Sequence, residues 1–145
     1  MASRGREQTK LYKITIPLAT SAVGNAGDQV AVVGTTHTAG PASGVTNGRA
    51  LGAAVEDYSQ TAGDTVVEVR LDVPVNLEWF DNDSTGIVLA NDFLAKCYFK
   101  TPSSVTKTTN SGGVNYALAG IIWDVDATRG VGVQMLTPAL VALTS

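Results

Sequence analysis

The stretch "ALGAAVEDYSQTAGDTVVEVRL", Ala50 to Leu71, decides the fold because it places a polar turn between two runs in which every second residue belongs to an apolar face. The second run continues to Val73, with Val67, Val69, Leu71 and Val73 on the side predicted to be buried and Val66, Glu68, Arg70 and Asp72 on the other. A period of two is typical of a β-strand with one buried face and one wet face. The stretch therefore predicts two strands joined by the turn "EDYSQTAGD".

A related stretch, "ALAGIIWDVDATRGVGVQM", runs from Ala117 to Met135. An alignment of the two places Gly63 on Gly130 and, after a gap at 64–66, Val67 on Val131. The apolar faces correspond as Leu51, Ala53 and Val55 with Leu118, Gly120 and Ile122, and as Val67, Val69 and Leu71 with Val131, Val133 and Met135. A slip of one residue would turn every core side chain outward, so the preserved parity indicates two equivalent strand pairs.

Each copy follows a short apolar run and a loose connector, "GDQVAVVG" at 27–34 before the first and "NDFLAKCYF" at 91–99 before the second. A long period repeated only twice is not a solenoid, which needs at least three units. The sequence therefore predicts an all-β fold, a single compact β-barrel or sandwich-like body over 14–145. Its half-repeats are predicted at about 27–73 and 91–136, meeting at "PVNLEWFDNDSTGIVLA".

A basic segment precedes an acidic body. Residues 1–13 hold Arg4, Arg6, Lys10 and Lys13 against Glu7, which leaves 6 basic and 12 acidic side chains in the rest of the chain. Residues 1–13 are predicted to be an N-terminal arm, either a solvated leader or a tether that orders on a partner. The run from Leu11 to Ile16 reads as a strand, and the acidic body makes nucleic acid an unfavourable partner.

Composition excludes several other classes. No run approaches the ~18 apolar residues of a membrane span, and the N-terminus lacks the apolar core of a signal peptide. A protein made in the cytoplasm, with no membrane partner, is expected. The single cysteine, Cys97, excludes an internal disulfide framework and a four-cysteine zinc site.

Candidate catalytic residues are few. His37, the one histidine, lies in a Thr/Gly/Pro-rich loop, with no Ser or Cys nucleophile at a recognisable spacing. Cys97 lies in "LAKCYF", where packing as a small apolar residue is the default. We therefore predict that the protein is not an enzyme, with no catalytic residues and no cofactor.

One segment has the spacing of a calcium loop. In "DNDSTG" and the residues after it, Asp81, Asp83, Thr85 and Asp92 fall at positions 1, 3, 5 and 12 of an EF-hand loop. The last position lacks the usual Glu, and the flanking residues do not read as paired helices. A polar turn between the two repeats explains the same residues, so no metal site is predicted here, and the loop stays an alternative.

Two adjacent aromatics, Trp79 and Phe80, stand where the repeats meet. Neighbouring residues of a strand point to opposite sides, so one ring can enter the core and the other needs a different cover. Both are candidates for a subunit interface, with capping of the core as the alternative. The tail "TPALVALTS", 137–145, is apolar after Pro138, so its side chains also need to be covered by other parts of the protein or by a partner.

The Ala50–Leu71 stretch, with its Leu-Gly strand, polar turn, Ala-Gly-Asp and Val-x-Val strand, resembles the head decoration, or cement, proteins of tailed bacteriophages. The resemblance extends over about Gly27 to Leu136 and is one of pattern. Positions that match the pattern are structural: Leu51, Gly52, Ala62, Gly63, Asp64, Val67 and Val69.

The resemblance implies a structural protein on the outer surface of a virion, a homotrimer that bridges capsomers and stabilises the capsid. It implies the major capsid protein as partner, and contacts made by the N-terminal segment through Arg4, Arg6, Lys10, Leu11 and Tyr12. The alternative is a calcium-dependent β-module that binds carbohydrate or another ligand through the Asp81–Asp92 loop.

Overall fold

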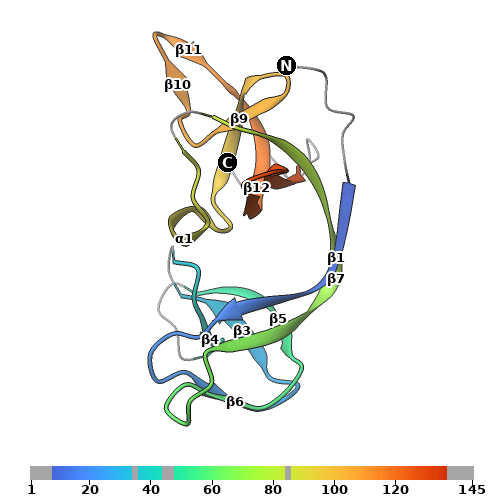
Figure 1. Ribbon diagram of the computed structural model, residues 1–145, viewed down its shortest axis with the longest axis vertical. Coiled ribbons are helices and arrows are strands. Elements are labelled where there is room, and N and C mark those ends of the chain that lie inside the picture. Colours follow the sequence, from blue (N-terminus) through green and yellow to red (C-terminus); the bar gives the residue numbers. More distant parts are fainter. Residues whose placement is uncertain (1–7, 34–35, 44–47, 84–85, 137–145) are drawn as a thin grey trace. The chain divides into compact units, whose positions relative to one another are not determined.

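The computed structural model describes residues 8–33, 36–43, 48–83 and 86–136 (Figure 1). Of these residues 61% are in strands and 3% in helix, which confirms the predicted all-β class. The chain divides into two compact units: an N-terminal unit, Leu11–Val75, and a C-terminal unit, Asn76–Ser145 together with Met1–Lys10. Each predicted half-repeat lies within one of these units, where the sequence had predicted one domain over 14–145.

The N-terminal unit closes its strands into a ring of pairings. Its strands are β1 (Gln8–Pro17, from Leu11 on), β2 (Val23–Gly24), β3 (Gln29–Val32), β4 (Ala39–Pro41), β5 (Arg49–Ala54), β6 (Tyr58–Ser59) and the first part of β7 (Val66–Asn82). Strands β4, β3, β5 and β7 pair in that order and antiparallel, and β1 also pairs with β7. Leu18, just after β1, forms a parallel bridge with Ala39 of β4. The bridge joins the two ends of the path, and β2 and β6 form a separate antiparallel pair.

The predicted alternation holds in β7 and fails in β5. Val67, Val69 and Leu71 are buried as predicted, with at most 6% of each residue exposed. Residues 51–54 of β5 are all buried, and Val55, which directly follows β5, is 44% exposed. Gly52 explains the difference, because its backbone lies so close to β7 that a Cβ there would collide with the carbonyl oxygen of Arg70.

The C-terminal unit forms a second closed ring. It contains the rest of β7, α1 (Leu89–Asp92), β8 (Lys96–Thr101), β9 (Ser104–Thr106), β10 (Asn110–Ser111), β11 (Val114–Asn115), β12 (Ala117–Asp126) and β13 (Gly130–Met135). The order is β7, β13, β12, β8 and β9, and β9 returns to β7 as a parallel partner. Closed rings leave few bare strand edges. The β10–β11 hairpin extends from the connection between β9 and β12 (Figure 1).

Side chains from every strand of this ring meet in one core: Phe80 from β7, Cys97 from β8, Val105 from β9, Ala119 and Ile122 from β12, and Val131 and Val133 from β13, with Ile87 from the loop before α1. All are at most 3% exposed. Alternate residues of β13 therefore face inward, as the predicted parity requires.

The two rings are equivalent strand by strand. Strands β1, β3, β4, β5 and the first part of β7 correspond to the second part of β7, β8, β9, β12 and β13. The closing bridges correspond too, Leu18 to Ala39 in one ring and Asn82 to Val105 in the other, both parallel. The internal repeat predicted from the sequence is therefore a repeat of topology.

The predicted alignment is wrong by one residue in the first strand of each copy. It placed Ala53 on Gly120, whereas the structure makes Gly52 the counterpart of Gly120. Gly52 lies opposite Leu71 and Gly120 opposite Met135, and a Cβ on either glycine would collide with a carbonyl oxygen of the partner strand. Each strand also has a register shift just before its glycine, between Ala50 and Gly52 in β5 and between Leu118 and Gly120 in β12, so the shifts correspond as the glycines do.

Candidate docking surface

Side chains at both ends fix β1 against β7. In the C-terminal unit Gln8 Nε2 donates to Glu78 Oε1 at 3.1 Å, and Trp79 Nε1 donates to Thr9 Oγ1 at 2.9 Å. In the N-terminal unit Lys13 Nζ lies 3.0 Å from Glu68 Oε1. Gln8 contacts Glu78, whereas Lys13, later in β1, contacts Glu68, earlier in β7. The two strands therefore run antiparallel. The predicted arm, 1–13, is therefore strand from Gln8 onward.

The stretches between these anchors carry the most exposed apolar side chains of the two strands. Tyr12 is 58% exposed and Val73 is 75% exposed. Lys13 follows Tyr12 and Pro74 follows Val73, and both are exposed. We call these four residues the β1–β7 patch.

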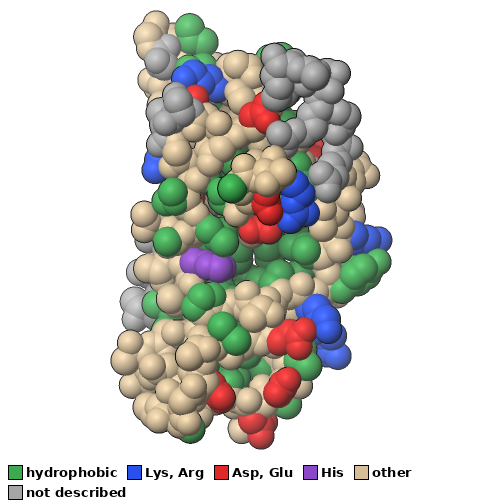
Figure 2. Space-filling model, viewed as in Figure 1, with side chains coloured by type: hydrophobic (Ala, Val, Ile, Leu, Met, Phe, Trp, Pro, Cys, Tyr) green, Lys and Arg blue, Asp and Glu red, His purple; other side chains and the backbone are tan. Residues whose placement is uncertain are grey.

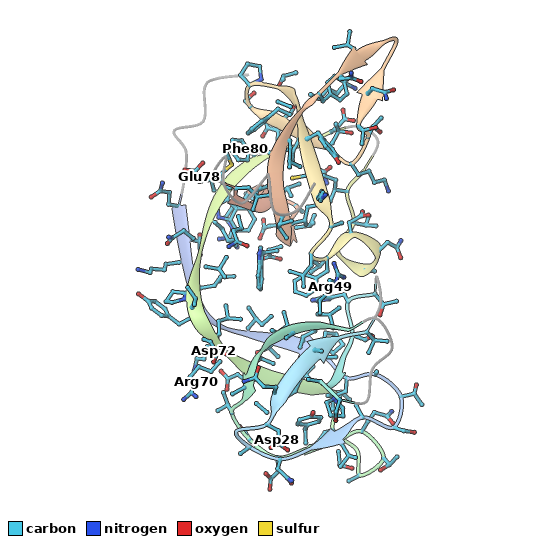
Figure 3. The ribbon with its side chains drawn as sticks, turned by 180° about the vertical axis from the view of Figure 1, so that it is seen from behind. Asp28, Arg49, Arg70, Asp72, Glu78 and Phe80 are labelled. Carbon is cyan, nitrogen blue, oxygen red and sulfur yellow. The ribbon has the colours of Figure 1, made fainter. Side chains whose placement is uncertain are left out.

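The patch exists because both strands break their alternation there. In β1 the consecutive residues Tyr12 and Lys13 are both exposed, the pattern that a β-bulge produces. In β7 the exposed run is 72–74. Figure 3 shows Arg70 and Asp72 on the side of β7 turned away from β3 and β5. The patch therefore combines an aromatic ring, apolar carbons and the cation of Lys13, and the exposed Asp72 lies next to it in β7.

The predicted contact residues fall on this strand or outside the described chain. Lys10 is exposed, Leu11 is half-buried and Tyr12 belongs to the patch. Arg4 and Arg6 lie outside the described residues.

The two interface candidates are buried within the C-terminal unit, which corrects the interface hypothesis for both. Trp79 is 2% exposed and Phe80 is 3% exposed. The guanidinium of Arg129 lies 4.1 Å from the centroid of the Trp79 ring, and Phe99 packs edge-on against Phe80 at 5.1 Å between centroids. β13, which follows the turn at 127–129, covers the indole of Trp79, and the core of the C-terminal unit covers the phenyl group of Phe80. Capping of the core, the alternative to an interface, therefore describes both residues.

The predicted calcium loop uses its carboxylates for internal contacts. Asp83 Oδ1 lies 3.1 Å from Lys100 Nζ, and Asp92 Oδ2 accepts the backbone N–H of Val88 at 2.8 Å. Lys107 Nζ lies 3.7 Å from the same Asp92 oxygen. Asp81 belongs to β7, α1 is one turn long, and Thr85 lies outside the described residues.

Asn82 shapes this loop, a role that the sequence did not indicate. Its Oδ1 accepts the backbone N–H of Ile87 at 3.0 Å and its Nδ2 donates to the carbonyl of Ile87 at 2.8 Å. The amide side chain thus takes the place of a strand partner and directs Ile87 into the core. Asn-specific pairing of this kind depends on the folded loop, so spacing alone does not reveal it.

Cys97 packs as a small apolar residue, as its position in the sequence predicts. It is fully buried in β8, and burial raises the pKa of its thiol to about 12, against a smaller lowering by a backbone hydrogen bond from Gly120. A thiol that stays protonated at neutral pH is a poor nucleophile. His37 is half-buried in the segment between β3 and β4.

A pocket with a volume of about 310 Å³ in the N-terminal unit carries four acidic side chains. Its lining is Thr15, Glu56, Asp57, Tyr58, Asp64, Val66, Val67 and Glu68. Figure 2 shows acidic side chains gathered over this unit. Asp57 Oδ1 accepts the N–H of Ala26 at 2.8 Å and Asp64 Oδ2 accepts that of Ser59 at 2.9 Å, so both hold loops in place.

These carboxylates do not form one ligand set. Over the described ranges of the chain, no three His, Cys, Asp or Glu side chains gather in a group that could hold a metal ion. The same ranges contain no helix with the length and apolar character needed to cross a bilayer.

Comparison with known proteins adds no relative to these observations: no family profile, no curated protein and no solved structure matches the chain.

Proposed function

We propose that this chain is a structural protein of a virus particle, which decorates the outside of a capsid and stabilises it by bridging capsomers. Its partner is the major capsid protein, and the protein acts as a homotrimer. It is made in the host cytoplasm and ends on the outer surface of the virion. The resemblance of the Ala50–Leu71 stretch to phage head decoration proteins motivates the proposal.

The β1–β7 patch is the single observation that carries the proposal beyond that resemblance. Tyr12 and Val73 leave large apolar surfaces in water on two paired strands, and they are more exposed than any other large apolar residue that is described in β1 or β7. Aromatic residues on an otherwise polar surface favour protein interfaces. The patch also includes Tyr12 of the predicted contact set, and Lys10 lies close to it in β1.

The construction of the two units supports the same role. A decoration protein resists mechanical and thermal stress through many weak contacts that act together, which requires a rigid body. Each unit is a closed ring of strands around its own buried side chains. Few backbone N–H and C=O groups are therefore left unpaired at strand edges, which makes each unit rigid.

The test measures binding to capsids. Emptied heads of the tailed phage whose genome carries this gene are mixed with the protein and sedimented. Because two apolar contacts are removed, we expect the double variant Tyr12→Ser, Val73→Ser to bind about tenfold or more weakly than the parent chain. Point variants are preferred to deletion of residues 1–10, which would also remove the Thr9 partner of Trp79.

The matched control is Val114→Ser. Val114 is 60% exposed in the β10–β11 hairpin and lies outside the patch. Its variant should bind as the parent does. Equal binding by the parent and the double variant would overturn the assignment of the patch, and no binding by the parent would overturn the proposed function. Light scattering of the parent tests the trimer, for which we expect three times the chain mass of 15.0 kDa.

A further inference from the structure

The second repeat continues beyond its last described strand. Leu71 and Met135 hold equivalent places, since each lies opposite the equivalent glycine of its ring. The spacing between these two residues also places Pro138 of the tail on Pro74. At the same spacing Ala139, Val141 and Leu143 fall on Val75, Leu77 and Trp79. Those three residues of β7 are buried, so the tail repeats the apolar parity of a strand.

In the first repeat the corresponding segment is the first strand of the next ring. Residues 76–82 of β7 pair with β13 and β9 in the C-terminal unit. The tail, 137–145, has the apolar pattern of such a first strand. The tail itself lies outside the described residues.

A comparison of the two first strands locates an open position. In the C-terminal unit the first strand has a further neighbour, since Gln8 and Thr9 of β1 contact Glu78 and Trp79. In the N-terminal unit the first strand is β1, and Leu18 corresponds to Asn82. By that spacing the counterparts of Glu78 and Trp79 are Ile14 and Thr15.

Nothing among the described strands fills this position. Within the described ranges β1 pairs with β7 alone, apart from the bridge that Leu18 makes to Ala39. The edge of β1 beside Ile14 and Thr15 therefore offers backbone groups to an added strand. Pro17, which has no N–H, ends the usable edge.

We propose that the tail of one copy of this chain adds as a β-strand to the edge of β1 of a second copy, beside Ile14 and Thr15. Backbone hydrogen bonds would supply the affinity and the alternating apolar side chains the register, as in other cases of strand addition. The tail's nine residues span about 30 Å when extended, more than the few residues of edge require. The inference names a contact between copies and does not depend on capsid binding.

The first experiment compares the full chain with a chain that ends at Leu136, by analytical ultracentrifugation over a range of concentrations. The full chain should assemble, and the shortened chain should need at least tenfold higher concentration to do so. In the full-length chain, Val141→Pro should weaken assembly to a similar extent, because proline removes a backbone donor. Val141→Thr, which keeps the donor and the branched shape, is the matched control.

The second experiment locates the contact. A peptide with the sequence of residues 137–145 is added to the shortened chain, and amide hydrogen exchange is measured. Protection should rise at Ile14 and Thr15, and a peptide with N-methylated alternate residues should give no protection.

The inference would be overturned by a full chain that stays monomeric at all concentrations, by a shortened chain that assembles as the full chain does, or by peptide protection confined to residues outside β1. A shortened chain that is less stable at every concentration would show that the tail serves its own chain, which also contradicts the proposal. Capsid binding by a monomeric protein would leave the proposed function in place.

Discussion

Trp79 Nε1 donates a hydrogen bond of 2.9 Å to Thr9 Oγ1, which fastens the N-terminal strand to a buried ring of β7. Trp79 is 2% exposed, so water is a poor substitute for the lost acceptor. Thr9→Val keeps the shape of the side chain and removes the oxygen. We expect it to lower the free energy of unfolding by about 1–3 kcal/mol, measured by urea denaturation.

Thr9→Ser is the control for that experiment, because it keeps the hydroxyl and loses only a methyl group. It should remain closer to the parent chain than Thr9→Val does. Equal losses in the two variants would mean that the methyl group, and not the hydrogen bond, holds the strand.

The equivalence of the two rings is tested by their glycines. At Gly52 and Gly120 a Cβ would collide with the backbone oxygen of Arg70 or Gln134, and backbone cannot move as a flexible side chain can. We expect Gly52→Ala and Gly120→Ala each to cost about 3 kcal/mol or more. Circular dichroism during thermal unfolding measures the effect.

Gly113 provides the comparison. Its φ is +84°, and a Cβ there would meet nothing within 4 Å, so Gly113→Ala carries only the cost of the left-handed backbone, about 1–2 kcal/mol. If Gly52→Ala and Gly120→Ala are no worse than Gly113→Ala, the two glycines are not the equivalent close contacts described above.

The all-β class and the repeat could be predicted because alternation survives wherever a strand has one buried face. Val67, Val69, Val131 and Val133 keep that pattern in both copies. The alternation fails in β5, since Gly52 admits the neighbouring backbone and both sides of the strand are covered. No local pattern reveals a close approach between residues that are distant in sequence.

The short strands escaped prediction for another reason. β4 and β9 lie in Gly, Pro, Ser and Thr-rich segments that read as connectors, and they become strands only because they close their rings through Leu18 and Asn82. The segment expected to be a junction is the second half of β7. Its alternation is obscured because Trp79 and Phe80 are both buried, in different surroundings.

The docking residues were predictable only in part. Tyr12 was singled out by its place in the N-terminal segment, but Val73 was expected in the core because it continues the parity of Leu71. It is 75% exposed because 72–74 is a run of consecutive exposed residues. Exposure of an apolar residue with core parity depends on where the packed neighbours end, which sequence periodicity does not record.

The buried thiol of Cys97 gives the stability a pH dependence. Its pKa is raised from 9.0 to about 12 by burial, so the folded state keeps the proton over a range in which the unfolded chain releases it. The stabilisation is complete below pH 9 and decreases as the pH rises from 9 towards 12. The loss attributable to this group between pH 8 and pH 10 is on the order of 1 kcal/mol.

Urea unfolding at pH 8 and pH 10 checks that value, with Cys97→Ala as the reference. The variant lacks the titrating group but retains all others, so its stability should fall less between the two pH values, whatever its absolute stability. Equal falls in the two proteins would mean that Cys97 ionises as easily in the folded state as in the unfolded chain.

Calcium separates the proposed function from the ligand-binding alternative. The ion pairs of Asp83 with Lys100 and of Asp92 with Lys107 occupy two of the predicted ligands, so calcium would have to displace a lysine from each. We expect the same Tm in millimolar calcium and in chelator, with magnesium as the control for ionic strength. A protein that binds calcium only when folded would instead melt at a higher temperature in calcium. A calcium-specific rise that disappears in Asp83→Asn would contradict the expectation and favour the calcium-dependent β-module.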